Sequence, residues 1–158
     1  MDIPKAMLEW VLSWVADDRR VLRVHATAEP DTHMCAADLV IEWDPTVLKL
    51  SADQVRPGKC WQQHIIADVS DFDAGLLVVS FFGPLSSAVS LDDESPRQLV
   101  ALKFDRLQPG VTEVSVVKRA TKTDSPFGVS KIYWGGPEAY PNMDLLGDFE
   151  PVVFQLTD

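Results

Sequence analysis

The side chains that could coordinate a metal or act as nucleophiles are few and lie far apart in the sequence. His33 and Cys35 form a His-x-Cys pair, and the only other cysteine is Cys60. A structural zinc site draws four ligands, usually from two such pairs, and the second pair is missing here. We therefore expect two buried free thiols and no metal or other cofactor. A Cys35–Cys60 disulfide is the alternative in an oxidising compartment.

An acidic stretch at Ser70–Gly75 (SDFDAG) is the second place where chemistry is conceivable. Asp68, Asp71 and Asp73 supply carboxylates at short spacing, and hard cations such as Ca²⁺ prefer oxygen ligands of this kind. The bidentate glutamate that completes an EF-hand loop does not follow at the required distance. The spacing therefore favours a plain hairpin loop over a calcium site.

Catalytic motifs are not recognisable in this sequence. None of the three histidines lies in a nucleophile, metal or acid–base pattern; they are His25, His33 and His64. The many Asp and Glu residues leave a carboxylate pair in a cleft as an alternative. We predict that the protein is not an enzyme.

Aromatic side chains are better candidates for a binding role, because Trp and Tyr are enriched at protein interfaces. Trp10 and Trp14 lie near the N-terminus, where the alternative is that both belong to the core. In a glycan-binding protein, Trp61 and Trp134 would supply an exposed platform on which a sugar stacks. The predicted partner-binding residues are Trp10, Trp14, Trp61, Tyr133, Trp134 and Tyr140.

The charge balance excludes one class of partner. The chain of 158 residues carries 24 acidic and 14 basic residues, which gives a formal net charge of −10. A protein that binds a nucleic-acid backbone needs Lys and Arg to displace counterions, so we predict no nucleic-acid partner. The acidic surface is compatible with a basic protein partner and with plain solvation.

Membrane and export signals are not visible in the sequence. No apolar run reaches about 18 residues, so we expect no membrane insertion. Met1 precedes an acidic, Trp-containing segment and not the basic region and cleavage site of a secretory signal. We expect synthesis in the cytoplasm, with the chain staying there or entering a virion or another particle. Removal of a leader is the alternative.

The fold prediction depends on the stretch Cys35–Leu50 (CAADLVIEWDPTVLKL). Apolar side chains recur at every second position from Ala37 to Trp43, which is the period of a half-buried β-strand. Asp44-Pro45 ends this strand, because proline lacks the N–H that a ladder needs. A short turn of helix at Thr46–Leu48 then places an apolar side chain back under the sheet. Together these features predict a corner of a β-sandwich.

Further strands are predicted along the rest of the chain. Val21–Ala28 alternates and has one wet face, whereas Leu76–Phe82 (LLVVSFF) is apolar on both faces and is therefore a central strand. Leu99–Leu107 and Thr112–Val116 flank a Pro-Gly turn and are predicted to pair as a hairpin. Val152–Leu156 is predicted as the closing strand.

The N-terminal segment Met7–Val15 fits either a strand or one face of a helix. Its Trp and Val residues favour a strand, and a docking arm over residues 1–15 is the alternative. In total, about nine short strands separated by Pro and Gly turns predict an all-β protein. We expect a single antiparallel β-sandwich with jelly-roll topology over residues 1–158.

The same landmarks occur in the order and spacing of a cohesin domain. Cohesins have a strand that ends in a Tyr-Asp-Pro-x-Val-Leu corner, and here Trp43 takes the aromatic place before Asp44-Pro45. The later x-Ile-x-Phe strand of that family is matched by Leu102 and Phe104. The sequence thus resembles a cohesin over Leu8 to Val117. Some carbohydrate-binding modules share this sandwich.

The resemblance implies a jelly roll that binds other proteins and performs no chemistry. No motif here matches the dockerin-binding residues of cohesins, so none are assigned. We predict a non-enzymatic docking or structural module, acting as an accessory or decoration component of a large assembly such as a virus or phage particle. Its partner is then a protein. The alternatives are a carbohydrate-binding module with a glycan partner and a free cohesin-type adaptor.

Overall fold

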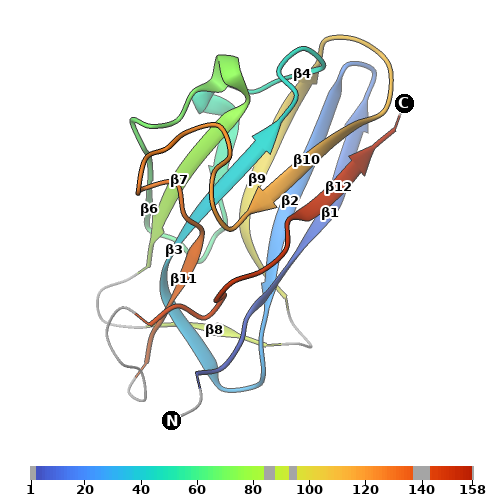
Figure 1. Ribbon diagram of the computed structural model, residues 1–158. Helices are drawn as coiled ribbons and strands as arrows, with labels where there is room; N and C mark the ends of the chain where they lie inside the picture. The colour runs from blue at the N-terminus through green and yellow to red at the C-terminus, as the bar shows by residue number, and fades with distance from the viewer. Residues whose placement is uncertain (1–2, 84–87, 93–95, 137–142, 158) are drawn as a thin grey trace.

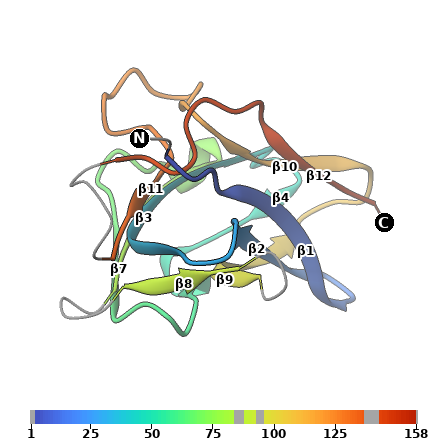
Figure 2. The ribbon, with the colours of Figure 1, turned by 90° about the horizontal axis from the view of Figure 1, so that it is seen from below.

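Two antiparallel β-sheets pack face to face in the computed structural model, which describes residues 3–83, 88–92, 96–136 and 143–157 (Figure 1). Figure 2 shows the two layers from one end. The smaller sheet has the strand order β1-β2-β9-β4, and β5 also pairs with β9. The larger sheet has the order β12-β10-β3-β7-β6, and β8 and β11 also pair with β3.

Both sheets combine long and short strands. The smaller sheet contains β1 (Met7–Ala16), β2 (Arg19–Thr27), β4 (Leu48–Lys49), β5 (Val55–Pro57) and β9 (Arg97–Arg106). The larger sheet contains β3 (Thr32–Trp43), β6 (Gln63–Ile66), β7 (Leu76–Phe82), β8 (Val89–Leu91), β10 (Thr112–Val117), β11 (Lys131–Trp134) and β12 (Val152–Leu156). Two short 3-10 helices, Ala52–Gln54 and Phe72–Ala74, lie in loops.

The predicted all-β antiparallel sandwich is confirmed, with twelve strands in the described part of the chain where about nine were expected. The surplus comes from short strands that sequence periodicity does not reveal, because two or three residues cannot show an alternation. One of them, β8, lies within the stretch before β9 that has no apolar alternation. Among the described residues, no helix is long and apolar enough to cross a membrane.

The core lies between the sheets and follows the predicted alternation. In β2, Leu22, Val24 and Ala26 are fully buried, and the residues between them are partly exposed. Across the gap, the ring of Trp43 contacts that of Phe104 edge to face, with centroids 5.5 Å apart. Such tilted pairs are the geometry that aromatic quadrupoles favour. The end of β3 is thereby joined to the smaller sheet.

The Asp-Pro corner after β3 forms as a tight turn, and its hydrogen bonds are those of the single turn of helix that the sequence predicted. The carbonyl of Asp44 accepts from the amides of Val47 (3.2 Å) and Leu48 (3.0 Å). The Asp44 carboxylate accepts from the amide and the hydroxyl of Thr46, and these bonds lower the pKa of the carboxyl. Leu48 is fully buried and begins β4 in the opposite sheet. The corner therefore moves the chain from one layer to the other.

The predicted hairpin between Leu99–Leu107 and Thr112–Val116 is wrong. Strand β9 pairs with β2 on one edge and with β4 and β5 on the other, whereas β10 pairs with β3 and β12. Both edges of each strand are occupied, so the connection crosses between the sheets. The amide of Leu107 donates to Val47 at the start of this crossing (2.7 Å). Alternation reports which face of a strand is buried, and it does not report the neighbour.

The N-terminal segment is a strand, as its composition favoured over the helical arm. Strand β1 pairs with β2 through a bulge, in which Leu12 lies opposite Leu22 and Trp14 lies opposite Val21. Ser13 is the extra residue. Because one inserted residue reverses the side of the sheet to which the following side chains point, Trp14 faces outward while Trp10 faces the other layer.

Candidate functional site

The outer face of the larger sheet, which points away from the core, has a covered half and an open half. In the covered half, Val40, Leu76, Val78 and Val117 form a second buried cluster, with Ala120 packed on it. Strand β3 is consequently buried on both faces from Leu39 to Trp43, where the sequence predicted a half-buried strand. The cover includes the segment from Lys118 to Ser130, which joins β10 to β11.

A buried carboxylate holds this covering segment in place. Glu42 accepts hydrogen bonds from the amide and hydroxyl of Thr121 (both 2.8 Å) and from the amide of Lys122 (3.0 Å). The ammonium of Lys122 donates in turn to the carbonyls of Trp43 (2.6 Å) and Ala74 (2.7 Å). A carboxylate that accepts three such bonds is well compensated for its burial.

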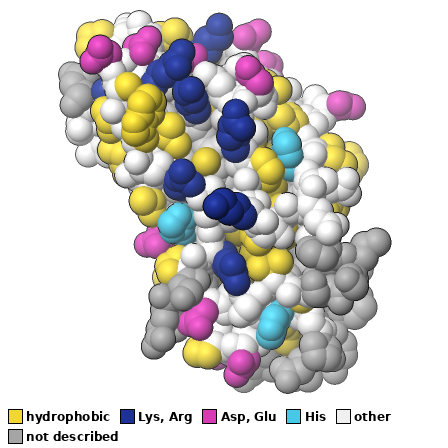
Figure 3. All heavy atoms as spheres, turned by 180° about the vertical axis from the view of Figure 1, so that it is seen from behind, with side chains coloured by type: hydrophobic (Ala, Val, Ile, Leu, Met, Phe, Trp, Pro, Cys, Tyr) yellow, Lys and Arg dark blue, Asp and Glu magenta, His cyan; other side chains and the backbone are white. Residues whose placement is uncertain are grey.

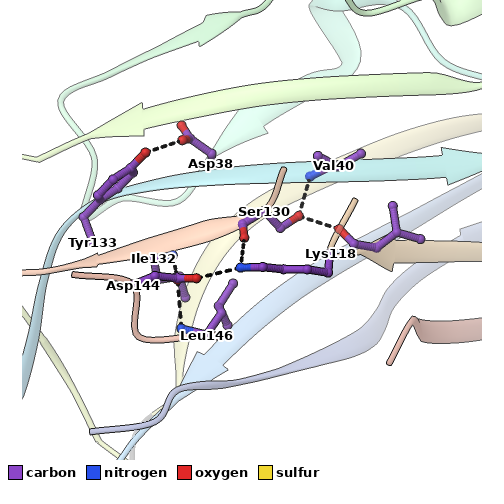
Figure 4. Close-up of polar contacts among 9 residues, drawn as sticks. Asp38, Val40, Lys118, Ser130, Ile132, Tyr133, Asp144 and Leu146 are labelled. Atoms are coloured by element: carbon purple, nitrogen blue, oxygen red, sulfur yellow. Dashed lines mark hydrogen bonds and ion pairs between the residues drawn. The ribbon is translucent and has the colours of Figure 1, made fainter. Parts of the chain in front are cut away.

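The end of the covering segment is fastened by Ser130, which is fully buried. Its hydroxyl accepts from the amide of Val40 (2.9 Å) and donates to the carbonyl of Val117 (2.7 Å) (Figure 4). Strands β10 and β11 pair one after the other along the same edge of β3, and Ser130 lies at the break between them. Ser130 therefore supplies the bonds that a continuous strand would have made there.

The open half presents side chains from β6, β7, β3 and β11 in register. One row across the sheet contains Phe82, Ala36 and Tyr133. The next row contains Ile65, Ser80, Asp38 and Lys131. Ile65 is 54% exposed and Phe82 is 36% exposed, so two large apolar side chains of adjacent strands face solvent together. We call these seven residues the open face.

The polar groups of the open face are held in fixed positions. Asp38 accepts from the hydroxyl of Tyr133 (2.8 Å; Figure 4) and from the hydroxyl of Ser80 (2.6 Å), which links three strands. Burial, followed by the bond to Asp38, raises the pKa of Tyr133 to about 12. The phenol therefore stays protonated at neutral pH and acts as a donor, not as a base.

Strand β11 is anchored from behind by Asp144. Its carboxylate pairs with Lys118 (2.6 Å) and accepts from the amides of Ile132 (3.1 Å) and Leu146 (3.0 Å) (Figure 4). Lys118 also donates to the carbonyl of Ser130 (2.7 Å). These bonds fix the start of the short strand that carries Tyr133, and the amide of Trp134 donates to the carbonyl of Met143 (2.8 Å) at its end.

The structure places the predicted aromatic residues in different environments. Trp61 and Trp134 are 6% and 7% exposed, and the indole of Trp61 stacks on Phe81 and donates to Leu99 (3.1 Å). Their burial contradicts the predicted sugar platform. A glycan partner that binds elsewhere stays a prediction.

The other predicted aromatics remain candidates to differing degrees. Trp10 is half-buried, and its indole donates to the carbonyl of Val152 (2.8 Å), which joins the edges of the two sheets. Trp14 is 50% exposed on the smaller sheet, so the alternative of a core position is wrong for it. Tyr133 belongs to the open face. Tyr140 lies outside the described residues.

The cysteines and the SDFDAG stretch differ in part from what the sequence predicted. Both cysteines are free thiols; Cys60 is half-buried, but Cys35 is exposed, which corrects the predicted burial. Among the residues that the structure describes, no three His, Cys, Asp or Glu side chains converge as metal ligands do. The SDFDAG stretch forms the β6–β7 connection, in which Asp71 caps the short helix Phe72–Ala74 by accepting from the amide of Ala74.

Of the seven open-face residues only Tyr133 was predicted from the sequence, and the two large apolar ones, Phe82 and Ile65, carry no clear sequence signal. Phe82 ends a strand that is apolar on both faces, a pattern that predicts burial on both sides. The cover extends over Leu76 and Val78 only, so Phe82 at the far end of β7 is left exposed. Ile65 belongs to a four-residue strand, which is too short for a clear alternation.

No protein-family model and no curated protein matches the sequence. Solved structures do match: a cohesin module of a family 33 glycoside hydrolase from Clostridium perfringens superposes with a TM-score of 0.63 at 9% identity, over 99% of this chain and 97% of that one. A type II cohesin domain from the cellulosome of Acetivibrio cellulolyticus gives 0.59 at 13% identity, over 95% of each chain.

This chain has a cohesin-like fold. A cohesin in a type II cohesin–X-dockerin complex from Acetivibrio cellulolyticus also matches, with a TM-score of 0.59 at 14% identity, over 94% of this chain and 98% of that one. The predicted resemblance is therefore confirmed for the fold. The cohesin-like corner at Asp44-Pro45 lies where the sequence placed it, between the two sheets. Identities of this size establish fold and not partner.

Proposed function

We propose that this cohesin-like chain is a non-catalytic protein-docking module that binds a folded protein through the open face. The observation that carries the proposal is the exposure of Ile65 and Phe82 side by side on a rigid sheet. They are diagonal neighbours on adjacent strands, since Gln63 lies directly opposite Phe82 and Ser80 opposite Ile65, and this separation is within reach of large side chains. A compact apolar centre with polar neighbours is the usual anatomy of a protein interface.

The fixed polar groups around this centre support the same function. Asp38 is held by Ser80 and Tyr133, so its orientation is set before a partner arrives. A pre-oriented carboxylate loses little conformational entropy on binding and can fix the register of the partner. Lys131 lies beside Asp38 in the same row and adds an opposite charge to the recognition pattern.

The structural comparisons support the class of partner. One of the similar structures is a cohesin bound to an X-dockerin, and another is a type I cohesin–dockerin complex from Clostridium thermocellum. We therefore propose a dockerin-like protein module as the partner, which makes this chain a cohesin-type adaptor. An enzymatic role receives no support from the open face, because Tyr133 is held as a neutral donor.

The test compares two double variants in affinity capture from the native source. Ile65→Asp with Phe82→Asp places two charges at the centre of the open face. Leu107→Asp with Val111→Asp, at exposed positions between β9 and β10, is the matched control. We expect the control to capture the same partner as the wild type, and the open-face variant to lose at least about 2 kcal/mol, or roughly thirtyfold in affinity. Equal capture by both variants contradicts the proposal.

The finer expectation of a place in a virus or phage particle stays a prediction. Sedimentation of native material through a density gradient tests it. Migration of the chain with a megadalton particle supports a decoration role, whereas recovery as a species near 17.6 kDa supports the free adaptor.

A further inference from the structure

The outer face of the smaller sheet is basic, although the protein as a whole is acidic. Figure 3 shows a stripe of Lys and Arg side chains running down this side of the molecule. The net charge of −10 makes such a gathering unexpected from composition. The cations that the strand register places on this face are Arg19, Arg23, Lys49, Arg56 and Lys103, and Asp105 lies between Arg19 and Lys49 in one row. We call these five cations the basic face.

Strand pairing shows why these side chains point the same way. Leu22, Val24 and Leu102 are buried in the core, so the residues between them on β2 and β9 point outward. Arg23 lies opposite Ala101, which in turn lies opposite Arg56 of β5. Because cross-strand partners share a face of the sheet, all of these side chains belong to one surface.

Cationic and apolar side chains alternate on this surface. In one row across the strands, Val11 lies opposite Arg23. In the next row, Trp14 lies opposite Val21, which lies opposite Lys103. Trp14 is half exposed. A site that follows a nucleic-acid backbone presents a continuous positive groove, whereas Arg and Trp set among small apolar residues are typical of protein interfaces.

Three of the five cations have no ion-pair partner among the described residues. Arg19 lies 3.4 Å from Asp105, and Arg23 donates to Gln98. For Lys49, Arg56 and Lys103 no such contact with a described residue occurs. Their charges are therefore available to a ligand.

The dimensions of the basic face suit a macromolecule. Strands β1, β2 and β9 at about 4.8 Å spacing and about 3.4 Å per residue give roughly 500 Å² of flat surface, to which the short edge strands β4 and β5 add. Each partner in a standard protein interface buries about 800 Å². The face is thus near the size of one side of such an interface and far larger than a small anion requires.

We propose that the basic face docks a second protein, one that presents a carboxylate-rich surface. The module then has two binding faces on opposite sheets, and it can bridge the partner of the open face to an acidic protein. A phosphate or sulfate polymer of higher linear charge density, such as duplex DNA or heparin, is a poorer match than carboxylates, because the ten excess negative charges of the chain repel it more strongly at long range. Local carboxylates act within a Debye length of about 8 Å, where the three unpaired cations dominate.

The experiment uses fluorescent poly-L-glutamate as the carboxylate probe, titrated with the whole protein at about 50 mM and about 300 mM salt. The basic-face variant is Lys49→Glu, Arg56→Glu and Lys103→Glu, at three side chains with no ion pair to a described residue. A control of equal net charge is Lys5→Glu, Arg119→Glu, Gln155→Glu and Thr157→Glu, at exposed positions off this face and off the open face. We expect the basic-face variant to bind about tenfold more weakly and the control to stay within about twofold of wild type. High salt should remove most of the difference.

Several outcomes overturn the proposal. Equal weakening of both variants means that bulk charge and not this face binds the probe. Tighter binding of heparin or duplex DNA than of poly-L-glutamate assigns the face to another class of polymer, and absence of probe binding removes the site. Salt-sensitive self-association of the protein alone assigns the face to a second copy. The Ile65→Asp, Phe82→Asp variant should bind the probe normally, so this result is independent of the open face.

Discussion

Replacing Ser130 by alanine should destabilise the protein far more than the loss of one hydroxyl suggests. The Ser130 side chain is fully buried and bridges the amide of Val40 to the carbonyl of Val117. In Ser130→Ala both backbone groups lose their partner, and the buried position offers little room for water to replace it. A buried polar group left without a partner costs about 1–3 kcal/mol.

The two orphaned groups together set the expected magnitude. Since a carbonyl tolerates loss of one bond better than an amide does, we expect a total of about 3 kcal/mol in the free energy of unfolding. For a chain of this length, 1 kcal/mol corresponds to about 2–4 °C in the melting temperature. The variant should therefore melt roughly 6–12 °C below the wild type.

Urea unfolding followed by tryptophan fluorescence measures this loss. The control is Ser13→Ala, because the hydroxyl of Ser13 donates to Val21 at an exposed position in the β1 bulge (3.3 Å). That control should stay within about 0.5 kcal/mol of wild type. A Ser130→Ala variant that is as stable as the control would refute both the bridging role of the hydroxyl and the cost assigned to the two unpaired backbone groups.

Three further outcomes are expected. Gly58→Ala should cost about 3 kcal/mol in urea unfolding, because its Cβ would lie 1.9 Å from a β9 carbonyl oxygen, whereas Gly147→Ala, with φ of 58° and open space, should cost about 1 kcal/mol. Since the pKa of Tyr133 is raised to about 12 from an ordinary value of about 10, stability should fall as the pH rises from 10 to 12, and Tyr133→Phe should reduce that slope; an unchanged slope would argue against the buried phenol. Trp10→Phe should lose about 1 kcal/mol by removing the bond to Val152, and wild-type stability in this variant would show that water replaces the bond.

The strands themselves were largely predictable from the sequence. β2 alternates because one of its faces is core, and β7 is continuously apolar because both of its faces are covered over most of its length. The Asp44-Pro45 corner was predictable for a covalent reason, since proline cannot donate to a ladder. These features depend on neighbouring residues in the chain, so a local pattern contains them.

The candidate binding surfaces were not predictable in the same way. Trp61 and Trp134 were predicted to be exposed but are buried, because the burial of an aromatic side chain depends on which strand lies across from it. The apolar run of β7 predicted that Phe82 is buried, but it is exposed, because the covering segment from Lys118 to Ser130 does not reach it.

By itself, the sequence determined that the chain alternates in and out of a β-sandwich, where its main corner lies and that its net charge is acidic. The tertiary structure decided that β9 and β10 belong to different sheets and that half of the outer face of the larger sheet is covered. It also decided that five cations from four strands share the outer face of the smaller sheet. The physical reason is that a period of two records only the burial of one face of a strand. Pairing, covering and the gathering of charge arise from contacts between residues far apart in the chain.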